Sequence, residues 1–220
     1  MTWLRNRARD GSWLWFVLRR RVYQKGHALQ RLLIGPRLPV NPDGRVRVHL
    51  GCGDVNATGF INVDASAVPH VHYVRDVTDL SIFPDGFADL VYACHVLEHV
   101  RHPMVTRTLW EWRRVLKPGG VLRLSVPDFE RILHVYEACD RDLQSVVGFF
   151  MGGQQLPHDT HCSVFDRAYL SQKLVESGFR EVRQWDARRA EDHEMDDWAS
   201  RQIERSGRWF DISLNLEAVK

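Results

Sequence analysis

The stretch VRVHLGCGDVNATGFINVD, from Val46 to Asp64, holds two short apolar segments joined by a glycine-rich turn. Gly51 and Gly53 follow the first segment, and glycine there lets the backbone turn sharply and approach a ligand closely. Only nine residues, 51–59, separate the two segments, whereas a parallel crossover usually takes about a dozen or more. The stretch therefore predicts two parallel strands joined by a turn or an irregular loop in place of a full helix.

Further apolar segments alternate with helical patterns along the rest of the chain. Seven segments are candidate strands: Val46–Leu50, Phe60–Val63, Val71–Val74, Leu90–Cys94, Val121–Val126, Glu181–Trp185 and Ser213–Val219. Helices are expected over 103–116, where apolar side chains recur at helical spacing before the stop signal KPGG (117–120), from about residue 128, and over 166–178. We expect the polar residues 186–208 to form a loop with some helix.

This alternation predicts an α/β fold. We expect a Rossmann-like, mostly parallel seven-stranded sheet with helices on both faces, a shortened first crossover and an extra basic N-terminal helix. Residues 1–40 form the basic, aromatic N-terminal helical segment and a linker rich in Pro and Gly, and residues 41–220 form the α/β domain. Ligands of open parallel sheets bind at the carboxyl ends of the strands, so the site is expected there.

The charge of the chain is unevenly distributed. Residues 1–40 hold nine Lys and Arg and one acidic residue, whereas the remainder holds 21 basic and 27 acidic residues. Arginines interleaved with Trp3, Trp13, Trp15 and Phe16 suit contact with an anionic membrane surface. The same segment could pack on the domain or bind nucleic acid, and these alternatives stay open. The net negative charge of the remainder argues against a nucleic-acid partner.

The cysteines and the apolar runs indicate the cellular compartment of the protein. Cys52, Cys94, Cys139 and Cys162 form no CxxC pair, which is typical of a reduced, cytoplasmic protein. No apolar run approaches the ~18 residues of a membrane span, and the apolar run 13–18 is too short for a signal peptide. We expect a cytoplasmic protein, peripheral at the inner face of the membrane if the N-terminal segment binds lipid.

Two carboxylates stand at the ends of predicted strands. Asp64 ends the second strand, where a carboxylate can accept both hydroxyls of a ribose. Asp76 follows the third strand and could accept from an adenine amino group, while the backbone N–H of Val77 meets the ring nitrogen. Either aspartate could instead close a turn or cap a helix. Three successive strand ends with Gly-x-Gly, Asp and Asp together favour a cofactor that carries adenosine.

In this order the motifs resemble those of class I S-adenosylmethionine-dependent methyltransferases. The matching stretches are HLGCG (49–53), INVD (61–64), RDVTDLSIFPDGFADLVYACHVLEHV (75–100), VLKPGGVLRLSVPD (115–128) and SVFDRAYLSQKLVESGFREV (163–182). The resemblance runs from about Arg45 to the end and implies S-adenosyl-L-methionine as the cofactor. The short first crossover agrees, because it leaves no helix N-terminus for the pyrophosphate of NAD.

The resemblance implies roles for particular residues. Gly51 and Gly53 would line the methionine end of the cofactor, Asp64 would bind the ribose, and Asp76 and Val77 would hold the adenine. Cys94 and His95, after the fourth strand, would flank the sulfonium and the substrate opening. The complete set of implied cofactor-binding residues is Leu50, Gly51, Cys52, Gly53, Asp64, Asp76, Val77, Cys94 and His95.

A second resemblance concerns the acceptor. The stretch GGQQLPHDTH (152–161) is similar to a Gly-Gly-Gln and Asp-x-His pattern of small bacterial methyltransferases associated with surface polysaccharide and lipid-linked sugar synthesis. It implies O-methylation of a sugar or glycolipid precursor, with Gln154, Asp159 and His161 binding the substrate. The alternatives are a methyltransferase of another small molecule, a non-catalytic S-adenosylmethionine-binding regulator and an RNA methyltransferase.

Transfer to a hydroxyl benefits from a general base within hydrogen-bond reach. His161 is the first candidate, with Asp159 beside it in sequence, and His95 and Asp128 are the others because both stand at carboxyl ends of strands. We expect Glu98 to hold a backbone group or an arginine.

The same loop contains a possible set of metal ligands. The spacing of His158, His161 and Cys162 would allow them to share a metal ion, but no fourth ligand is evident in the sequence. We therefore expect no metal site.

Overall fold

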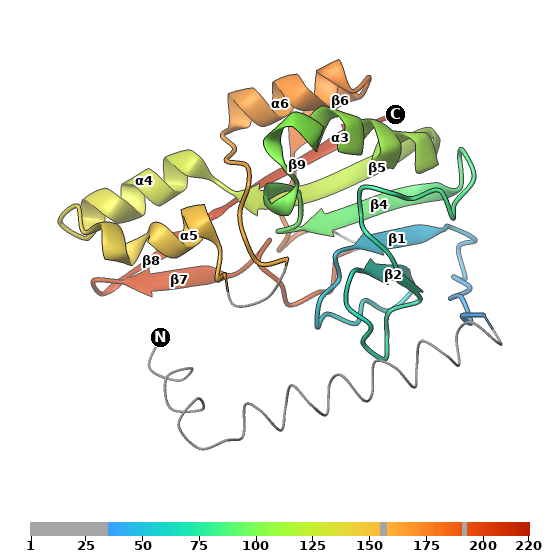
Figure 1. Ribbon diagram of the computed structural model, residues 1–220, viewed down its shortest axis with the longest axis horizontal. Helices are drawn as coiled ribbons and strands as arrows, with labels where there is room; N and C mark the ends of the chain where they lie inside the picture. The colour runs from blue at the N-terminus through green and yellow to red at the C-terminus, as the bar shows by residue number, and fades with distance from the viewer. Residues whose placement is uncertain (1–34, 155–157, 191–192) are drawn as a thin grey trace.

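The computed structural model describes residues 35–154, 158–190 and 193–220, so the segment predicted over residues 1–34 lies outside the described residues. Its main sheet has seven strands in the order β3-β2-β1-β4-β5-β9-β6 (Figure 1). They are β1 (Arg47–Leu50), β2 (Phe60–Asp64), β3 (Tyr73–Val74), β4 (Ala88–Cys94), β5 (Leu116–Pro127), β6 (Arg180–Gln184) and β9 (Ser213–Val219). The first five pair in parallel, and β9 is antiparallel to β5 and β6. The predicted mostly parallel, seven-stranded, Rossmann-like fold is confirmed.

The short first crossover is also confirmed. Residues 51–59 form turns and irregular backbone between β1 and β2, without a helix. Helices follow later, as α3 (Val105–Val115), α4 (Phe129–Ala138), α5 (Val147–Met151) and α6 (Arg167–Glu176), with short 3-10 helices η1 (Leu97–His99), η2 (His102–Met104) and η3 (Leu143–Ser145).

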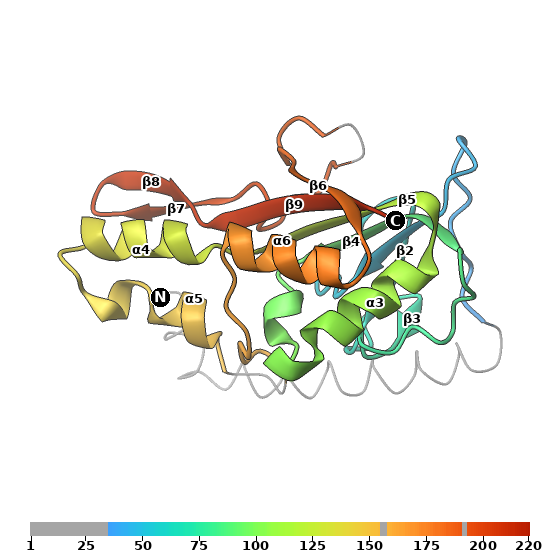
Figure 2. The same cartoon turned by 90° about the horizontal axis from the view of Figure 1, so that it is seen from above.

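Helices were expected on both faces of the sheet, but in the part of the chain that the structure describes, the helices that pack on the main sheet lie on one face (Figure 2). Leu109 and Trp112 of α3 and Leu170 of α6 are completely buried there, against the apolar side chains of β1, β4 and β5. Asp166 caps α6 by accepting from the backbone N–H of Tyr169 at 2.7 Å. Alternate residues of buried strands thus share one apolar core with the two helices.

The opposite face of the sheet is aromatic and polar. His49 of β1 lies 5.1 Å from the ring of Tyr92 of β4, measured between ring centroids. Residues 185–190 and 193–199 cover this face, and the Tyr92 hydroxyl donates to Asp197 at 2.6 Å. His49 is only 2% exposed, and burial lowers its pKa to about 4.

This buried histidine should make the protein acid-sensitive. The unfolded chain takes up a proton at His49 below about pH 6.5, whereas the folded chain excludes it until about pH 4. The unfolded state therefore binds more protons in this window, and stability falls as the pH falls. Urea unfolding should show wild type losing about 3 kcal/mol more than His49→Phe between pH 6.5 and 4. Parallel losses in the two proteins would contradict this.

Two details of the predicted elements are wrong. Residues 186–208 were expected to form a loop with some helix, but they contribute β7 (Gln202–Arg205) and the first residue of β8 (Arg208–Asp211), which form an antiparallel hairpin. Its turn is Ser206-Gly207, with φ of +49° and +74°, and two central residues at positive φ are what a two-residue hairpin requires. In addition, the strand predicted over Val121–Val126 is longer, because β5 starts at Leu116, directly after α3, and includes KPGG (117–120).

Candidate functional site

The glycine turn after β1 meets the segment after β4. The backbone N–H of Gly51 donates to the Val63 carbonyl of β2 at 2.8 Å. Gly51 has φ of +61°, and a Cβ on it would overlap the side chain of Val96. Glycine is therefore needed both for the backbone conformation and for the close approach. This packing brings the carboxyl ends of β1, β2 and β4 together.

Gly53 offers a matched comparison for this close approach. It also has positive φ, +52°, but the position of its Cβ has no neighbouring heavy atom within 4 Å. Gly51→Ala should therefore destabilise the protein by about 2–4 kcal/mol, from the left-handed backbone and the overlap with Val96. Gly53→Ala should cost about 1 kcal/mol, from the backbone alone. Urea unfolding measures both, and equal losses would rule out the overlap.

Asp64 organises the glycine turn. One carboxylate oxygen accepts from the backbone N–H of Gly53 at 2.8 Å, and the other accepts from the backbone N–H of Ser66 at 2.7 Å. Each oxygen keeps a further lone pair that could accept a hydroxyl. The open space beside Gly53 and the free acceptor positions of Asp64 could accommodate the hydroxyls of a ribose.

The other predicted cofactor residues lie in two settings. Asp76 is exposed and closes a turn, accepting from the N–H and the hydroxyl of Thr78 at 2.8 and 2.7 Å. The carbonyl of Val77 accepts from the indole of Trp112 at 2.8 Å, which ties this loop to α3. Leu50 and Cys52, by contrast, have side chains buried in apolar clusters. The side chain of Asp76 can therefore contact a ligand, whereas the side chains of Leu50 and Cys52 cannot.

Cys94 and His95 follow β4. The Cys94 side chain packs with the aromatic cluster of the second face, and burial raises the pKa of its thiol. His95 has φ of +53° and stacks on Trp198 with 5.8 Å between ring centroids. The Ser213 hydroxyl donates to the Trp198 carbonyl, so it must accept from Nε2 of His95 at 2.8 Å. The lone pair of neutral His95 therefore lies on Nδ1.

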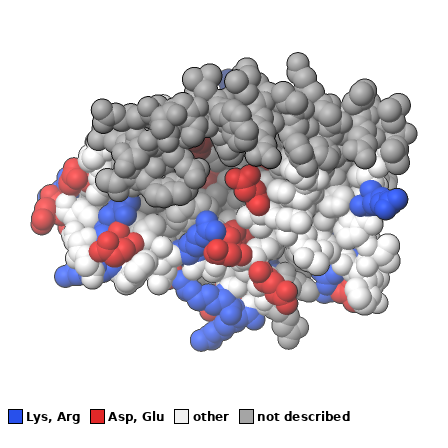
Figure 3. Space-filling view, turned by 90° about the horizontal axis from the view of Figure 1, so that it is seen from below, with Lys and Arg blue, Asp and Glu red and all other residues white. Residues whose placement is uncertain are grey.

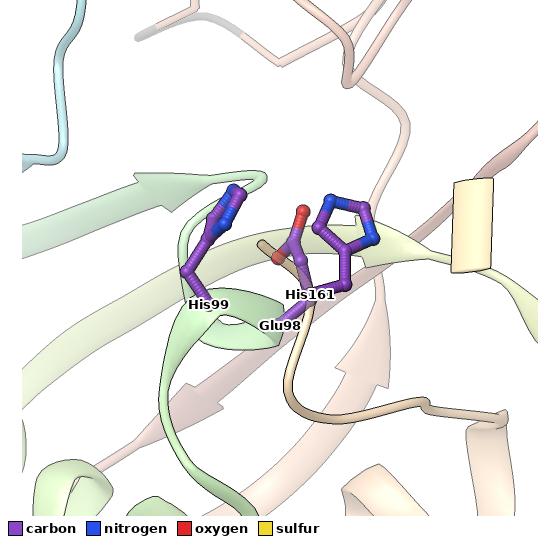
Figure 4. A group of neighbouring side chains, drawn as sticks. All are labelled: Glu98, His99 and His161. Carbon is purple, nitrogen blue, oxygen red and sulfur yellow. The ribbon is translucent and has the colours of Figure 1, made fainter. Parts of the chain in front are cut away.

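Glu98, His99 and His161 converge beside His95. Glu98 and His99 come from η1, while His161 comes from the segment after α5, and the Glu98 carboxylate lies between the two imidazoles (Figure 4). Oxygen and nitrogen atoms from all three side chains lie within 4.8 Å of one another. The two rings meet edge to face, with 4.8 Å between centroids. Residues more than 60 positions apart in the sequence thus form one cluster at the carboxyl end of the sheet.

Glu98 is the least expected member. Its side chain is 1% exposed, and within the described residues neither carboxylate oxygen accepts a hydrogen bond. Burial raises its pKa to about 8. The expectation that Glu98 holds a backbone group or an arginine is wrong, because η1 turns its side chain inward. The spacing of His95, Glu98 and His99 directly after a strand is the signal that could have identified it.

Backbone carbonyls orient both histidines of the cluster. Nδ1 of His161 donates to the Phe149 carbonyl at 2.9 Å, and Nδ1 of His99 donates to the Thr160 carbonyl at 3.2 Å. In these tautomers the lone pair of each ring lies on Nε2. Asp159, which sequence proximity suggested as the partner of His161, does not orient it.

The Gly-Gly-Gln loop holds His161 in place. The N–H of Gln154 donates to the Asp159 carbonyl at 3.0 Å, and its side-chain amide donates to Met151 at 3.1 Å. A Cβ on Gly152, which has φ of +73°, would overlap the Asp159 carbonyl. The N–H of His161 donates to the same Met151 carbonyl at 3.2 Å. These contacts join residues 151–154 to residues 159–161, and His161 lies on the second of these two segments.

Asp128, the third candidate base, caps α4. It accepts from the backbone N–H of Glu130 at 3.1 Å and pairs with Nε of Arg131 at 3.3 Å. It is 6% exposed, and burial raises its pKa. Its oxygens thus already have partners, unlike those of Glu98.

A polar cavity of about 360 Å³ adjoins His95 through Ser213. Three arginines, two aspartates, two side-chain amides and Trp185 contribute to its walls. The arginines are Arg131, Arg188 and Arg201, and Arg188 pairs with Asp211 of the same wall at 2.5 Å. Such a lining provides donors and acceptors for a polar ligand.

Residues 55–124 match a family model described as a methyltransferase domain. No curated protein matches the chain. Among solved structures, an S-adenosylmethionine-dependent methyltransferase from Archaeoglobus fulgidus superposes with a TM-score of 0.51 at 14% identity, covering 91% of this chain and 94% of the other. This likeness shows the fold.

Two further structures are similar at lower scores. A Thermotoga maritima S-adenosylmethionine-dependent methyltransferase has a TM-score of 0.49 at 17% identity, covering 98% of this chain and 97% of its own. The Burkholderia thailandensis 1,6-didemethyltoxoflavin-N1-methyltransferase also has 0.49, at 14% identity, covering 100% and 86%. The methyltransferase domain matched over residues 55–124, on the confirmed Rossmann-like sheet, supports an S-adenosylmethionine-dependent methyltransferase with S-adenosylmethionine as its cofactor.

Proposed function

We propose that this methyltransferase methylates a hydroxyl of a sugar or glycolipid precursor in cell-surface polysaccharide synthesis. The observation that carries the proposal is the polar cavity beside His95. Its volume of about 360 Å³ suits a small molecule. Guanidinium, carboxylate and amide groups with one tryptophan form a lining that suits the hydroxyls and phosphates of an activated sugar.

The glycine turn and the two aspartates form the proposed cofactor site. S-adenosylmethionine supplies a methyl group on a sulfonium, which leaves with the carbon–sulfur bonding pair. Gly51 and Gly53 would border its methionine end, Asp64 would accept the ribose hydroxyls, and Asp76 with Val77 would hold the adenine. Leu50 and Cys52 could contribute only backbone atoms, because their side chains are buried. In this proposal residues 41–220 form the catalytic domain.

Three groups were candidate bases for the acceptor hydroxyl, and their geometry favours His161. Asp128 is occupied as a helix cap, and the Nδ1 lone pair of His95 lies 3.4 Å from Glu98. His161 keeps its lone pair on Nε2, and burial lowers its pKa, so the ring is neutral at pH 7. Removal of the acceptor proton is therefore proposed to depend on Nε2 of His161, with Gln154 and Asp159 shaping the substrate side of the loop.

Labelled methyl transfer tests the acceptor directly. The full chain would be incubated with methyl-labelled S-adenosylmethionine and nucleotide sugars, lipid-linked sugars, unrelated hydroxylated small molecules or RNA. We expect label in a sugar acceptor. Label only in another small molecule or in RNA would overturn the sugar proposal, and cofactor binding without transfer to any acceptor would favour a regulator.

The charges on one face of the described surface bear on the RNA alternative. On the face shown in Figure 3, the coloured acidic and basic side chains are interleaved, whereas an RNA-binding surface gathers basic residues.

No helix of the described residues is long and apolar enough to cross a bilayer. Contact of residues 1–34 with an anionic membrane belongs to this proposal, and vesicle sedimentation with and without anionic lipid would test it.

A further inference from the structure

We propose that Glu98, His99 and His161 form a binding site for a divalent transition-metal ion that holds the acceptor hydroxyl. The metal site is argued from the structure alone. Its catalytic role rests on the proposed function.

The first argument is the isolation of the Glu98 carboxylate. Its side chain is 1% exposed, and within the described ranges neither oxygen has a hydrogen-bond partner. Leaving a carboxylate buried without a partner costs several kcal/mol. A cation between Glu98 and the two imidazoles would supply the missing partner.

The imidazole of His95, which lies beside Glu98, does not fill that role. Nδ1 of His95 lies 3.4 Å from Oε1 of Glu98. However, the hydrogen bond to Ser213 places the proton of neutral His95 on Nε2, so Nδ1 presents a lone pair. His95 therefore offers the carboxylate no proton.

The second argument is the orientation of the two histidines. Both donate from Nδ1 to backbone carbonyls, of Thr160 for His99 and of Phe149 for His161. Metal-binding histidines usually donate their other ring N–H to such an acceptor, which fixes the tautomer and the direction of the ligand nitrogen. In both rings Nε2 is the nitrogen left for a metal.

The third argument is the geometry of the set. The three ligand atoms lie within 4.8 Å of one another. Ligands at about 2.0–2.1 Å from a tetrahedral zinc ion lie roughly 3.3 Å apart, so side-chain movements of about 1 Å would close the set. Two imidazoles and one carboxylate suit zinc, cobalt or iron rather than magnesium, which prefers oxygen. Three protein ligands also leave a coordination position for a substrate oxygen.

This open position gives the site a task in methyl transfer. An acceptor hydroxyl bound to the cation becomes more acidic, because the positive charge stabilises the alkoxide. Its proton is released to solvent, and the oxygen lone pair forms the new bond to the methyl carbon. The carbon–sulfur bonding pair leaves with sulfur as the sulfonium becomes a thioether. With the ion bound, the Nε2 lone pair of His161 is a metal ligand and does not take up the proton itself, so His161 promotes removal of the proton through the ion.

Metal titration of the full chain tests the site without any acceptor. Protein treated with chelator and dialysed would be titrated with Zn²⁺ by calorimetry and with Co²⁺ by visible absorption. We expect one ion per chain, a Co²⁺ spectrum of low coordination number, and no displacement by Mg²⁺. Glu98→Gln, His99→Ala and His161→Ala should each weaken Zn²⁺ binding by at least about 100-fold.

The chain offers two control variants. His134 is exposed on α4, so His134→Ala should bind Zn²⁺ like wild type. His158→Ala should do the same, because His158 is not part of the converging group. Thermal unfolding and S-adenosylmethionine affinity of each variant would show that the fold and the cofactor site are intact.

The outcomes separate the two proposals. Absence of Zn²⁺ and Co²⁺ binding, or binding that survives both Glu98→Gln and His99→Ala, would overturn the metal site. One-ion binding that these variants abolish supports the site even if no sugar is methylated, in which case only the proposed function fails. Sugar methylation at full rate by metal-free protein would overturn the catalytic role of the ion and leave the proposed function standing.

Discussion

Replacing His161 with alanine is expected to lower methyl transfer about 1,000-fold while leaving S-adenosylmethionine affinity within about twofold. Loss of a group that handles the acceptor proton typically costs about 10²–10⁴ in rate. His161 comes from the segment after α5, whereas the glycine turn and Asp64 come from the ends of β1 and β2. Labelled transfer measures the rate, and calorimetry measures cofactor affinity.

His134→Ala is the matched control for His161→Ala, because it removes an exposed imidazole from α4 without touching the cluster. Its rate should equal that of wild type. Full activity of His161→Ala would exclude any role of its Nε2 in transfer. A parallel loss of cofactor affinity would instead place His161 at the cofactor.

Asp64→Ala is expected to weaken S-adenosylmethionine binding by about 100-fold. The carboxylate accepts from the N–H of Gly53, which shapes the glycine turn, and it is the proposed acceptor of the ribose hydroxyls. A hydrogen bond to a charged group contributes roughly 1.5–3 kcal/mol, so two lost ribose contacts account for at least this factor. Calorimetry with S-adenosylmethionine checks the expectation directly.

Asp142→Ala controls for the loss of a turn carboxylate elsewhere. Asp142 accepts from the backbone N–H of Gln144 at 3.0 Å and caps η3, so its loss should leave cofactor affinity unchanged. Cofactor affinity of wild-type strength in Asp64→Ala would show that Asp64 serves the turn alone.

Much of the fold could be read from local patterns. The strand predicted over Ser213–Val219 is observed with the same bounds, because its apolar residues and its position after a polar stretch are both local signals. The missing first helix followed from the count of residues between β1 and β2. The hairpin of β7 and β8 was missed even though Ser206-Gly207 is a turn signal, because its strands are mostly polar and only Ile203 is buried.

Only part of the candidate cluster could be predicted from the sequence. His161 and His95 stood out as reactive residue types near predicted loop positions. Glu98 and His99 did not, because their environment depends on η1 turning Glu98 inward. The Glu98 carbonyl accepts from the N–H groups of Cys162 and Ser163 at 2.7 and 3.0 Å. That long-range pairing, which no local pattern encodes, brings the segment of His161 against η1.

Local patterns of the chain predict the class of the sheet, the absence of a phosphate-binding helix and the order of Gly51, Asp64 and Asp76 along the strand ends. These follow from hydrophobic periodicity and residue spacing, which are local properties of the chain. Which donors and acceptors meet depends instead on the tertiary structure. It left the Glu98 carboxylate without a hydrogen-bond partner among the described residues and aimed His99 and His161 beside it, because burial and hydrogen bonding depend on residues far apart in sequence.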